Sequence, residues 1–189
     1  MNENYLILLI LIIIIIYKCL NYNSYSYQIS HFDNKMYKVQ PFNKQKSAEI
    51  LSQLRDYSKN LCSCFNLNST ICKKYLNRFT RLQKIINELS FSENSLDNNS
   101  TSYTINKSEL VLCLRSKKTK EYHDLNIIKY ILTHELAHII CPEIGHTDLF
   151  YNINKYLLQL VKDNKLFDII NFKNNPTEYC GIELNEYLL

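Results

Sequence analysis

Residues 133–138 (THELAH) are the stretch around which we expect the rest of the chain to be organised. On a helix, His134 and His138 project from one face, one turn apart, which is the separation that two ligands of a single zinc ion need. Glu135 then stands beside the metal rather than on it, where it can take a proton from a water on the zinc. The pattern H-E-x-x-H fixes only three positions and also occurs by chance, so its surroundings must decide what it means.

The surroundings of the motif have the pattern of a helix that ends soon after it. Asp124 is suited to cap the N-terminus, and Pro142 stops the helix at its other end. Between them, residues at helical spacing share one face. These are Ile127, Ile131, His134, His138 and Cys141. The sequence therefore predicts a helix over 125–141 that carries the motif in its last turns.

A third histidine, His146, follows directly after Gly145, one of only two glycines in the chain. Three of the five histidines thus fall between 134 and 146, and we expect His146 to be the third zinc ligand. The gap between His138 and His146 leaves three carboxylates as alternative third ligands. They are Glu143, Asp148 and Glu178.

Cys141 is a rival of another kind, because it shares the face of the two motif histidines. If it joined three histidines, the zinc would be fully coordinated and structural, with no position left for water. Since the helix must end at Pro142, we expect Cys141 to point into the core instead.

The composition indicates one domain of modest size with appendages. The chain has 189 residues and a formal charge of +4, which neither demands nor excludes an anionic partner. Its seven cysteines lack the regular spacing of a disulfide framework, so we expect reduced thiols in a reducing compartment. Cys62, Cys64 and Cys72 match no common zinc-binding spacing and are expected to be free and mostly buried.

The N-terminus is a hydrophobic run in which nearly every residue from 5 to 17 is Leu or Ile. We expect residues 1–20 to form an uncleaved single-pass membrane anchor, followed by a tether over 21–43. Lysines on its C-terminal side place the domain in the cytosol by the positive-inside rule. The alternative is a cleaved signal peptide and a secreted or lumenal domain, which the Asn-x-Ser/Thr sequons at Asn68, Asn98 and Asn106 would suit.

The remaining segments predict a domain over 44–189, with a helical part over 44–90 and a catalytic part over 101–183. Apolar spacing indicates further helices, and two alternating stretches indicate strands on either side of a turn. The expected helices cover 44–60, 69–90 and 147–162, and the expected strands cover 101–106 and 109–115. The strand at 109–115 is a candidate to hold a peptide by backbone pairing, and a core hairpin is the ordinary alternative. Residues 92–100 are a polar loop by composition.

The motif, together with Gly145-His146, Leu149-Phe150 and the tail at 175–181, resembles the WLM and SprT-like zinc metallopeptidases, and in particular the WLM-like proteins of large DNA viruses. The resemblance covers about 101–183. It implies a small zincin-like α+β domain with a short antiparallel sheet, a zinc site of three histidines, and hydrolysis of peptide bonds. In some members the substrate is a protein crosslinked to DNA.

The leading hypothesis is therefore a membrane-anchored zinc endopeptidase that acts on a protein or peptide substrate. Tyr179 is a candidate to donate a hydrogen bond to the oxyanion, although an aromatic core residue would explain it equally well. One alternative is a non-catalytic module that zinc stabilises at a membrane. Another is a protease of DNA–protein crosslinks, but the hydrophobic N-terminus argues against a nucleic-acid partner.

Overall fold

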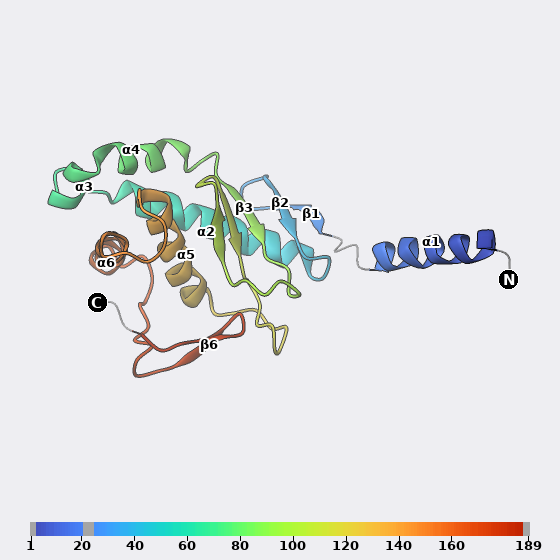
Figure 1. Cartoon of the computed structure of the whole chain (residues 1–189). Coiled ribbons are helices and arrows are strands. Elements are labelled where there is room, and N and C mark those ends of the chain that lie inside the picture. The colour runs from blue at the N-terminus through green and yellow to red at the C-terminus, as the bar shows by residue number, and fades with distance from the viewer. Residues whose placement is uncertain (1–2, 21–24, 187–189) are drawn as a thin grey trace.

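A five-stranded mixed sheet packed against helices forms the body of the molecule (Figure 1). The computed structural model describes residues 3–20 and 25–186. The predicted α+β class is confirmed.

The sheet has the strand order β1-β2-β3-β5-β4. Its outer pairs, β1 with β2 and β4 with β5, are antiparallel, whereas β3 is parallel to both of its neighbours. The prediction of a short antiparallel sheet was therefore wrong for the centre of the sheet. The strands are β1 (Ser26–Ile29), β2 (Met36–Val39), β3 (Ser90–Glu93), β4 (Tyr103–Ile105) and β5 (Glu109–Leu112).

Strand β3 was not predicted, because its sequence, SFSE, is too polar to read as a buried strand. Its last residue, Glu93, is nevertheless buried, and its carboxylate lies 3.2 Å from the guanidinium of Arg115, which is equally buried. The backbone N–H of Gln40 donates a further hydrogen bond of 2.8 Å to Glu93. An ion pair with a partner distant in sequence thus makes this polar strand compatible with the interior.

The helices agree with the predicted ones except the second, expected over 69–90, which is divided at Tyr75 into α3 and α4 and ends at Ile85, before β3 begins. Helices α2 and α5 contact the sheet, and α6 packs against α5 (Figure 1). The helices of this body are α2 (Lys44–Ser63), α3 (Thr70–Lys74), α4 (Leu76–Ile85), α5 (Leu125–Ile140) and α6 (Asp148–Asp163). A separate hairpin of β6 (Thr177–Tyr179) and β7 (Ile182–Leu184) follows them.

The segment 21–43, for which we expected a tether, contributes two strands to the sheet. Tyr37 and Val39 of β2 are buried in the core, and β1 forms the sheet edge beyond them. Residues 21–24 lie outside the described part of the chain.

Helix α1 (Glu3–Leu20) extends away from the sheet and the other helices (Figure 1). Within the described residues, no helix is long and apolar enough to cross a membrane. The side chains from Ile7 to Ile16 of this helix are exposed. The prediction of a membrane-spanning anchor is not supported.

The expectation of reduced thiols was wrong for two cysteines. Cys113 and Cys180 form a disulfide with a Cα–Cα distance of 6.1 Å, although 67 residues separate them in sequence. The bond joins the end of β5 to the turn of the β6–β7 hairpin. Cys62, Cys64 and Cys72 are free, as expected.

Candidate metal centre

Helix α5 carries the motif and is fixed at both ends and in its middle. Asp124 caps it as predicted, accepting a hydrogen bond of 2.8 Å from the backbone N–H of Asn126, and Pro142 follows its last turn. In its middle, the hydroxyl of Tyr57 on α2 lies 2.5 Å from that of Thr133, which itself donates to the carbonyl of Lys129. Because Thr133 precedes the first motif histidine, this contact fixes the helix at the site.

Three histidines converge at the C-terminal end of α5. The Nε2 atoms of His134, His138 and His146 are separated by 3.0 to 3.2 Å in every pair. Among the described residues, this is the group whose ligand atoms could together hold a metal ion. The sequence prediction placed the same three residues around one ion.

The geometry of the three nitrogens fits zinc. Nitrogens that share one zinc ion at ~2.0–2.1 Å in a tetrahedral arrangement lie ~3.3 Å apart, close to the separations here. Burial, together with the charges of the other two histidines, lowers the pKa of His134 to about 3. Burial and the neighbouring His146 and Lys107 lower the pKa of His138 to about 4. Both imidazoles are therefore neutral at pH 7, the form that binds metal.

Phe150 lies beside all three imidazoles. Its ring stacks on that of His138 with centroids 4.1 Å apart, and its centroid lies 4.8 Å from that of His134 and 4.9 Å from that of His146. Phe150 is fully buried in the first turn of α6. This helix therefore supports the cluster from the side opposite the solvent.

A short loop brings His146 back to the end of α5. Gly145 has a φ of +83°, in the left-handed region that glycine adopts without strain. Thr147 then caps α6, accepting a hydrogen bond of 3.3 Å from the backbone N–H of Phe150. The Thr147 hydroxyl also donates to the carboxylate of Glu143, so that this side chain closes the loop.

The rival ligands lie outside the histidine cluster. Glu143 is engaged by Thr147, and Glu178 accepts a hydrogen bond of 2.6 Å from the backbone N–H of Gly181. Asp148 is an exposed residue in the first turn of α6. Cys141 is fully buried in the core, as expected.

Glu135 lies next to the cluster and receives a hydrogen bond from another element. Its Oε2 accepts a bond of 2.9 Å from the hydroxyl of Thr104 on β4, and the residue is only 6% exposed. Burial raises the pKa of Glu135 to about 7, while the Thr104 bond opposes the rise. A carboxyl group with a pKa near neutrality is suited to exchange protons with a substrate.

Tyr179 is fully buried, and its hydroxyl lies 2.6 Å from that of Ser102. Ser102 also accepts a hydrogen bond of 2.9 Å from the backbone N–H of Cys113. The ring of Tyr179 contacts that of His123 at 4.8 Å between centroids and lines the same cavity as His134. Tyr179 thus links the hairpin to β5 beside the site.

Two cavities meet at the histidine cluster and form a cleft across it. One has a volume of about 390 Å³ and the other of about 570 Å³, and His134, Glu135 and His146 contribute to the lining of both. Strand β4, the edge of the sheet, borders the larger cavity with Tyr103 and Thr104. The candidate substrate strand at 109–115 was therefore placed one strand too far inward, because β5 lies between β3 and β4.

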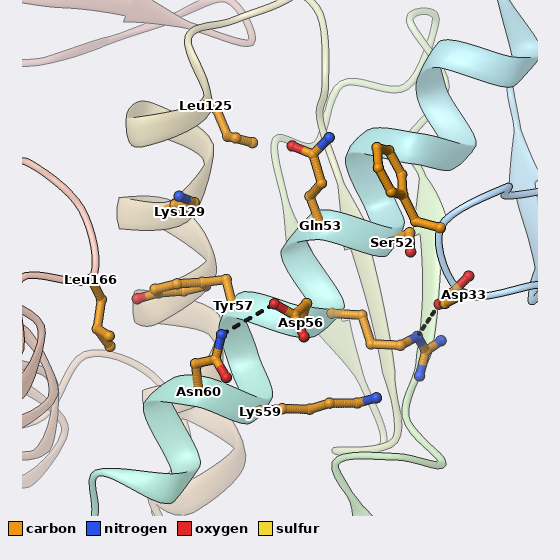
Figure 2. Close-up of a pocket in the computed structure, with 12 residues that line it drawn as sticks. Asp33, Ser52, Gln53, Asp56, Tyr57, Lys59, Asn60, Leu125, Lys129 and Leu166 are labelled. Carbon is orange, nitrogen blue, oxygen red and sulfur yellow. Dashed lines mark hydrogen bonds and ion pairs between the residues drawn. The ribbon is translucent and has the colours of Figure 1, made fainter.

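A separate cavity of about 450 Å³ is lined by residues of α2 and by Leu125 and Lys129 of α5 (Figure 2). Three of its charged groups, Asp33, Arg55 and Asp56, have partners among the residues that line it. The carboxylate of Asp33 lies 3.9 Å from Arg55, and Asp56 accepts a hydrogen bond of 3.1 Å from Asn60. This cavity is distinct from the histidine site.

Sequence reasoning missed Thr104 and Lys107 as parts of the site. Lys107 lines the larger cavity, and its ammonium donates a hydrogen bond to the carbonyl of Cys141 at the end of α5. Both residues lie about thirty positions before their partners in the sequence. Because no periodic pattern connects positions so far apart, only the predicted strand at 101–106 pointed towards them.

Comparisons with known proteins place the chain among proteins of large DNA viruses. The uncharacterized protein R325 of Acanthamoeba polyphaga mimivirus is 39% identical over 174 residues, which cover 87% of this chain and 84% of that protein. The uncharacterized protein 042R of invertebrate iridescent virus 3 is 42% identical over 74 residues, covering 39% of this chain and 46% of the viral protein. No family model matches the chain.

A comparison with solved structures finds the crystal structure of Wss1 from Saccharomyces cerevisiae. The match has 14% sequence identity and a TM-score of 0.44, and it covers 68% of this chain and 91% of the crystallised chain. A likeness this slight carries no argument about activity. The kinship with R325 extends over most of both proteins, and the expected relation to proteins of large DNA viruses is thereby confirmed. The chain belongs to the family of viral proteins that includes R325 of mimivirus.

Proposed function

We propose that the chain is a zinc-dependent peptidase of the WLM type. In this proposal His134, His138 and His146 hold one zinc ion, and Glu135 is the general base. The observation that carries it is the convergence of three Nε2 atoms within 3.2 Å of one another beside a buried carboxyl group, at the meeting point of two cavities.

The residues have separate tasks in the proposed reaction. Zinc, when bound, would supply Lewis acidity, which activates water and polarises the scissile carbonyl. Glu135 accepts the proton of the attacking water and then delivers it to the leaving amine. Thr104 holds the Glu135 carboxylate through the bond of 2.9 Å from β4.

The substrate in this proposal is an extended peptide that pairs with the free edge of β4. That edge borders the cavity that Glu135 lines, so backbone pairing there would bring a peptide bond to the base. Tyr179 is the proposed donor to the oxyanion. Burial raises its pKa, so its hydroxyl keeps its proton, and rotation away from Ser102 would release it for donation.

Glu135→Gln tests the assignment of the base. We expect the zinc-loaded variant to keep its metal and to lose roughly 10²–10⁴-fold in the rate of casein hydrolysis. The matched control is Glu143→Gln, which removes a carboxylate from the same cleft and should leave the rate within a few-fold of the unsubstituted chain. Activity that survives Glu135→Gln with metal retained would refute the role of Glu135.

Removal of zinc separates a catalytic site from a structural one. A structural zinc ion contributes to folding directly, so a chelator would unfold the domain. We expect instead that chelation abolishes hydrolysis while circular dichroism shows most of the helical signal retained. Loss of the fold on chelation would favour the non-catalytic module.

A further inference from the structure

The smaller cavity at the histidine cluster has a composition that differs from the rest of the cleft. It lies between α5, Phe172 and the β6–β7 hairpin, and its volume is about 390 Å³. Because His134 and Glu135 form part of its lining, a side chain inside it would lie next to the reacting atoms of the proposed function. The size falls in the range of roughly 300–1,000 Å³ usual for ligand sites.

The walls of this cavity are largely apolar. Ile131 of α5, Phe172, and Ile182 and Leu184 of β7 contribute aliphatic and aromatic surface. Phe172 is 1% exposed and its ring meets that of Tyr130 edge to face at 4.9 Å, so this wall is firmly packed. Ile182, in contrast, is 49% exposed. An incoming apolar side chain would cover it and gain the free energy of removing both surfaces from water.

The rim of the cavity is acidic. Glu183 and Glu186 lie on the same strand and its continuation, and both are exposed. Two carboxylates at the entrance disfavour an acidic side chain, which would meet repulsion there and lose its hydration inside. The cavity thus favours apolar side chains in its interior and repels acidic side chains at its entrance.

The larger cavity, on the other side of the histidines, is lined by more residues with polar side chains, although its surface, like that of the smaller cavity, is more apolar than polar. Ser102, Thr104, Asn106 and Lys107 contribute hydroxyl, amide and ammonium groups there. A peptide lying across the cleft would therefore meet these polar groups on one side of the scissile bond and the side chains of Ile131, Phe172, Ile182 and Leu184 on the other.

The hairpin that forms the apolar wall is held in place before any substrate arrives. The disulfide from Cys180 to Cys113 ties its turn to the end of β5, and the backbone N–H of Cys180 donates a hydrogen bond of 3.1 Å to His123. A pocket whose wall is already fixed discriminates between side chains without first ordering itself.

We propose that this cavity receives a large apolar side chain of the substrate, from a residue directly beside the scissile bond, and that Ile182 and Leu184 are specificity-determining residues. The proposal rests on the peptidase function and names the substrate class of that same site. Acidic residues are excluded from this position by Glu183 and Glu186.

The test is a digest of casein and of a mixed peptide library by the zinc-loaded full chain, with the new termini identified by mass spectrometry. We expect Phe, Leu, Ile, Met or Tyr to be enriched about tenfold over Ala at one of the two positions that flank the cleaved bond, and Asp and Glu to be depleted there. The double variant Ile182→Ser/Leu184→Ser should reduce the enrichment several-fold. Glu183→Lys/Glu186→Lys should admit acidic residues.

Ile29→Ser is the matched control, because Ile29 is 55% exposed on β1, at the other edge of the sheet. It should leave the cleavage pattern unchanged, and thermal melts should show all variants folded. Cleavage without an apolar preference, or a preference that survives Ile182→Ser/Leu184→Ser, would overturn the pocket and leave the peptidase function standing. Absence of any cleavage by the unsubstituted chain would overturn the peptidase function itself.

Discussion

The hydroxyl of Thr104, on the edge strand β4, donates a hydrogen bond of 2.9 Å to the Glu135 carboxylate on α5. This bond connects the strand proposed to hold the peptide with the group proposed to move the proton. It also opposes the rise that burial causes in the pKa of Glu135.

Thr104→Val keeps the shape of the side chain and removes the donor. Because a hydrogen bond to a charged group contributes about 1.5–3 kcal/mol, we expect roughly a tenfold or greater loss in kcat and a shift of the acid limb of the pH–rate profile to higher pH. Steady-state kinetics between pH 5 and 9 measures both. Thr104→Ser retains the hydroxyl and should keep both kcat and the acid limb of the pH–rate profile close to those of the unsubstituted chain. Equal losses of kcat in Thr104→Val and Thr104→Ser would show that only packing at β4 matters.

Metal content distinguishes His146 from the rival ligands. Substitution of residues that only support the metal ligands typically lowers metal affinity roughly 10–100-fold. We expect His146→Ala to lower zinc affinity by more than this, because it removes a ligand. Glu143→Gln, Asp148→Asn and Glu178→Gln should keep one zinc ion per chain, because none of these carboxylates belongs to the cluster. Competition with a chromophoric chelator measures each affinity. A carboxylate variant that loses zinc while His146→Ala keeps it would reverse the assignment.

Tyr179→Phe tests whether the tyrosine hydroxyl takes part in the reaction. Ser102→Ala is its control, because it breaks the same bond of 2.6 Å but leaves the tyrosine hydroxyl in place. If the hydroxyl stabilises the oxyanion, kcat should fall by roughly 10²-fold in Tyr179→Phe and much less in Ser102→Ala. Equal changes in kcat and in melting temperature would assign Tyr179 to the core alone.

The parts of the fold that the sequence predicted are those with local signals. Helices α5 and α6 were expected close to their observed bounds, because the periodic apolar face of each helix begins within a few positions of its own capping residue. These capping residues are Asp124 for α5 and Thr147 for α6. Strand β3 carries no such signal. Its burial depends on the ion pair between Glu93 and Arg115. Arg115 is distant in sequence, and no pattern within β3 indicates this partner.

The residues of the candidate site likewise divide into those with a local sequence signal and those without one. His134, Glu135 and His138 come from one helix, so a spacing of four residues was enough to group them, and Gly145 marked the turn that returns His146. Thr104 contacts Glu135 because β4 takes the edge position in the sheet, and the sequence does not reveal this strand order. The disulfide between Cys113 and Cys180 likewise depends on how the hairpin docks, which the spacing of seven cysteines does not encode.

Loss of that disulfide should loosen the wall of the apolar cavity. A cross-link over 67 residues removes conformational freedom from the unfolded chain, and we expect Cys113→Ser/Cys180→Ser to lower the free energy of unfolding by about 2–4 kcal/mol. Urea unfolding with and without reductant measures this. Reductant should destabilise the unsubstituted chain to the same extent and have no further effect on the double variant. Equal stability of both chains under oxidising conditions would contradict the bond.

The histidines should make the metal-free domain less stable in acid. In the folded chain the pKa values of His134 and His138 are lowered from 6.5 to about 3 and about 4. Between pH 4 and 6.5 the unfolded chain therefore binds protons that the folded chain does not, so the free energy of unfolding falls as the pH falls through this window. Glu135 acts in the opposite direction, because its pKa is raised from 4.5 to about 7 and the folded chain holds its proton.

Glu135→Gln removes that opposing contribution and is the background for the measurement. In the presence of chelator, we expect the urea midpoint of this variant to fall between pH 7.5 and pH 5. Adding His134→Gln and His138→Gln should make the fall smaller, because the two groups that gain protons on unfolding are then absent. All other titrating groups are the same in both proteins, so the difference between the two slopes reports the histidines alone. Identical slopes would mean that the two imidazoles titrate alike in the folded and unfolded chain, contrary to their burial beside one another.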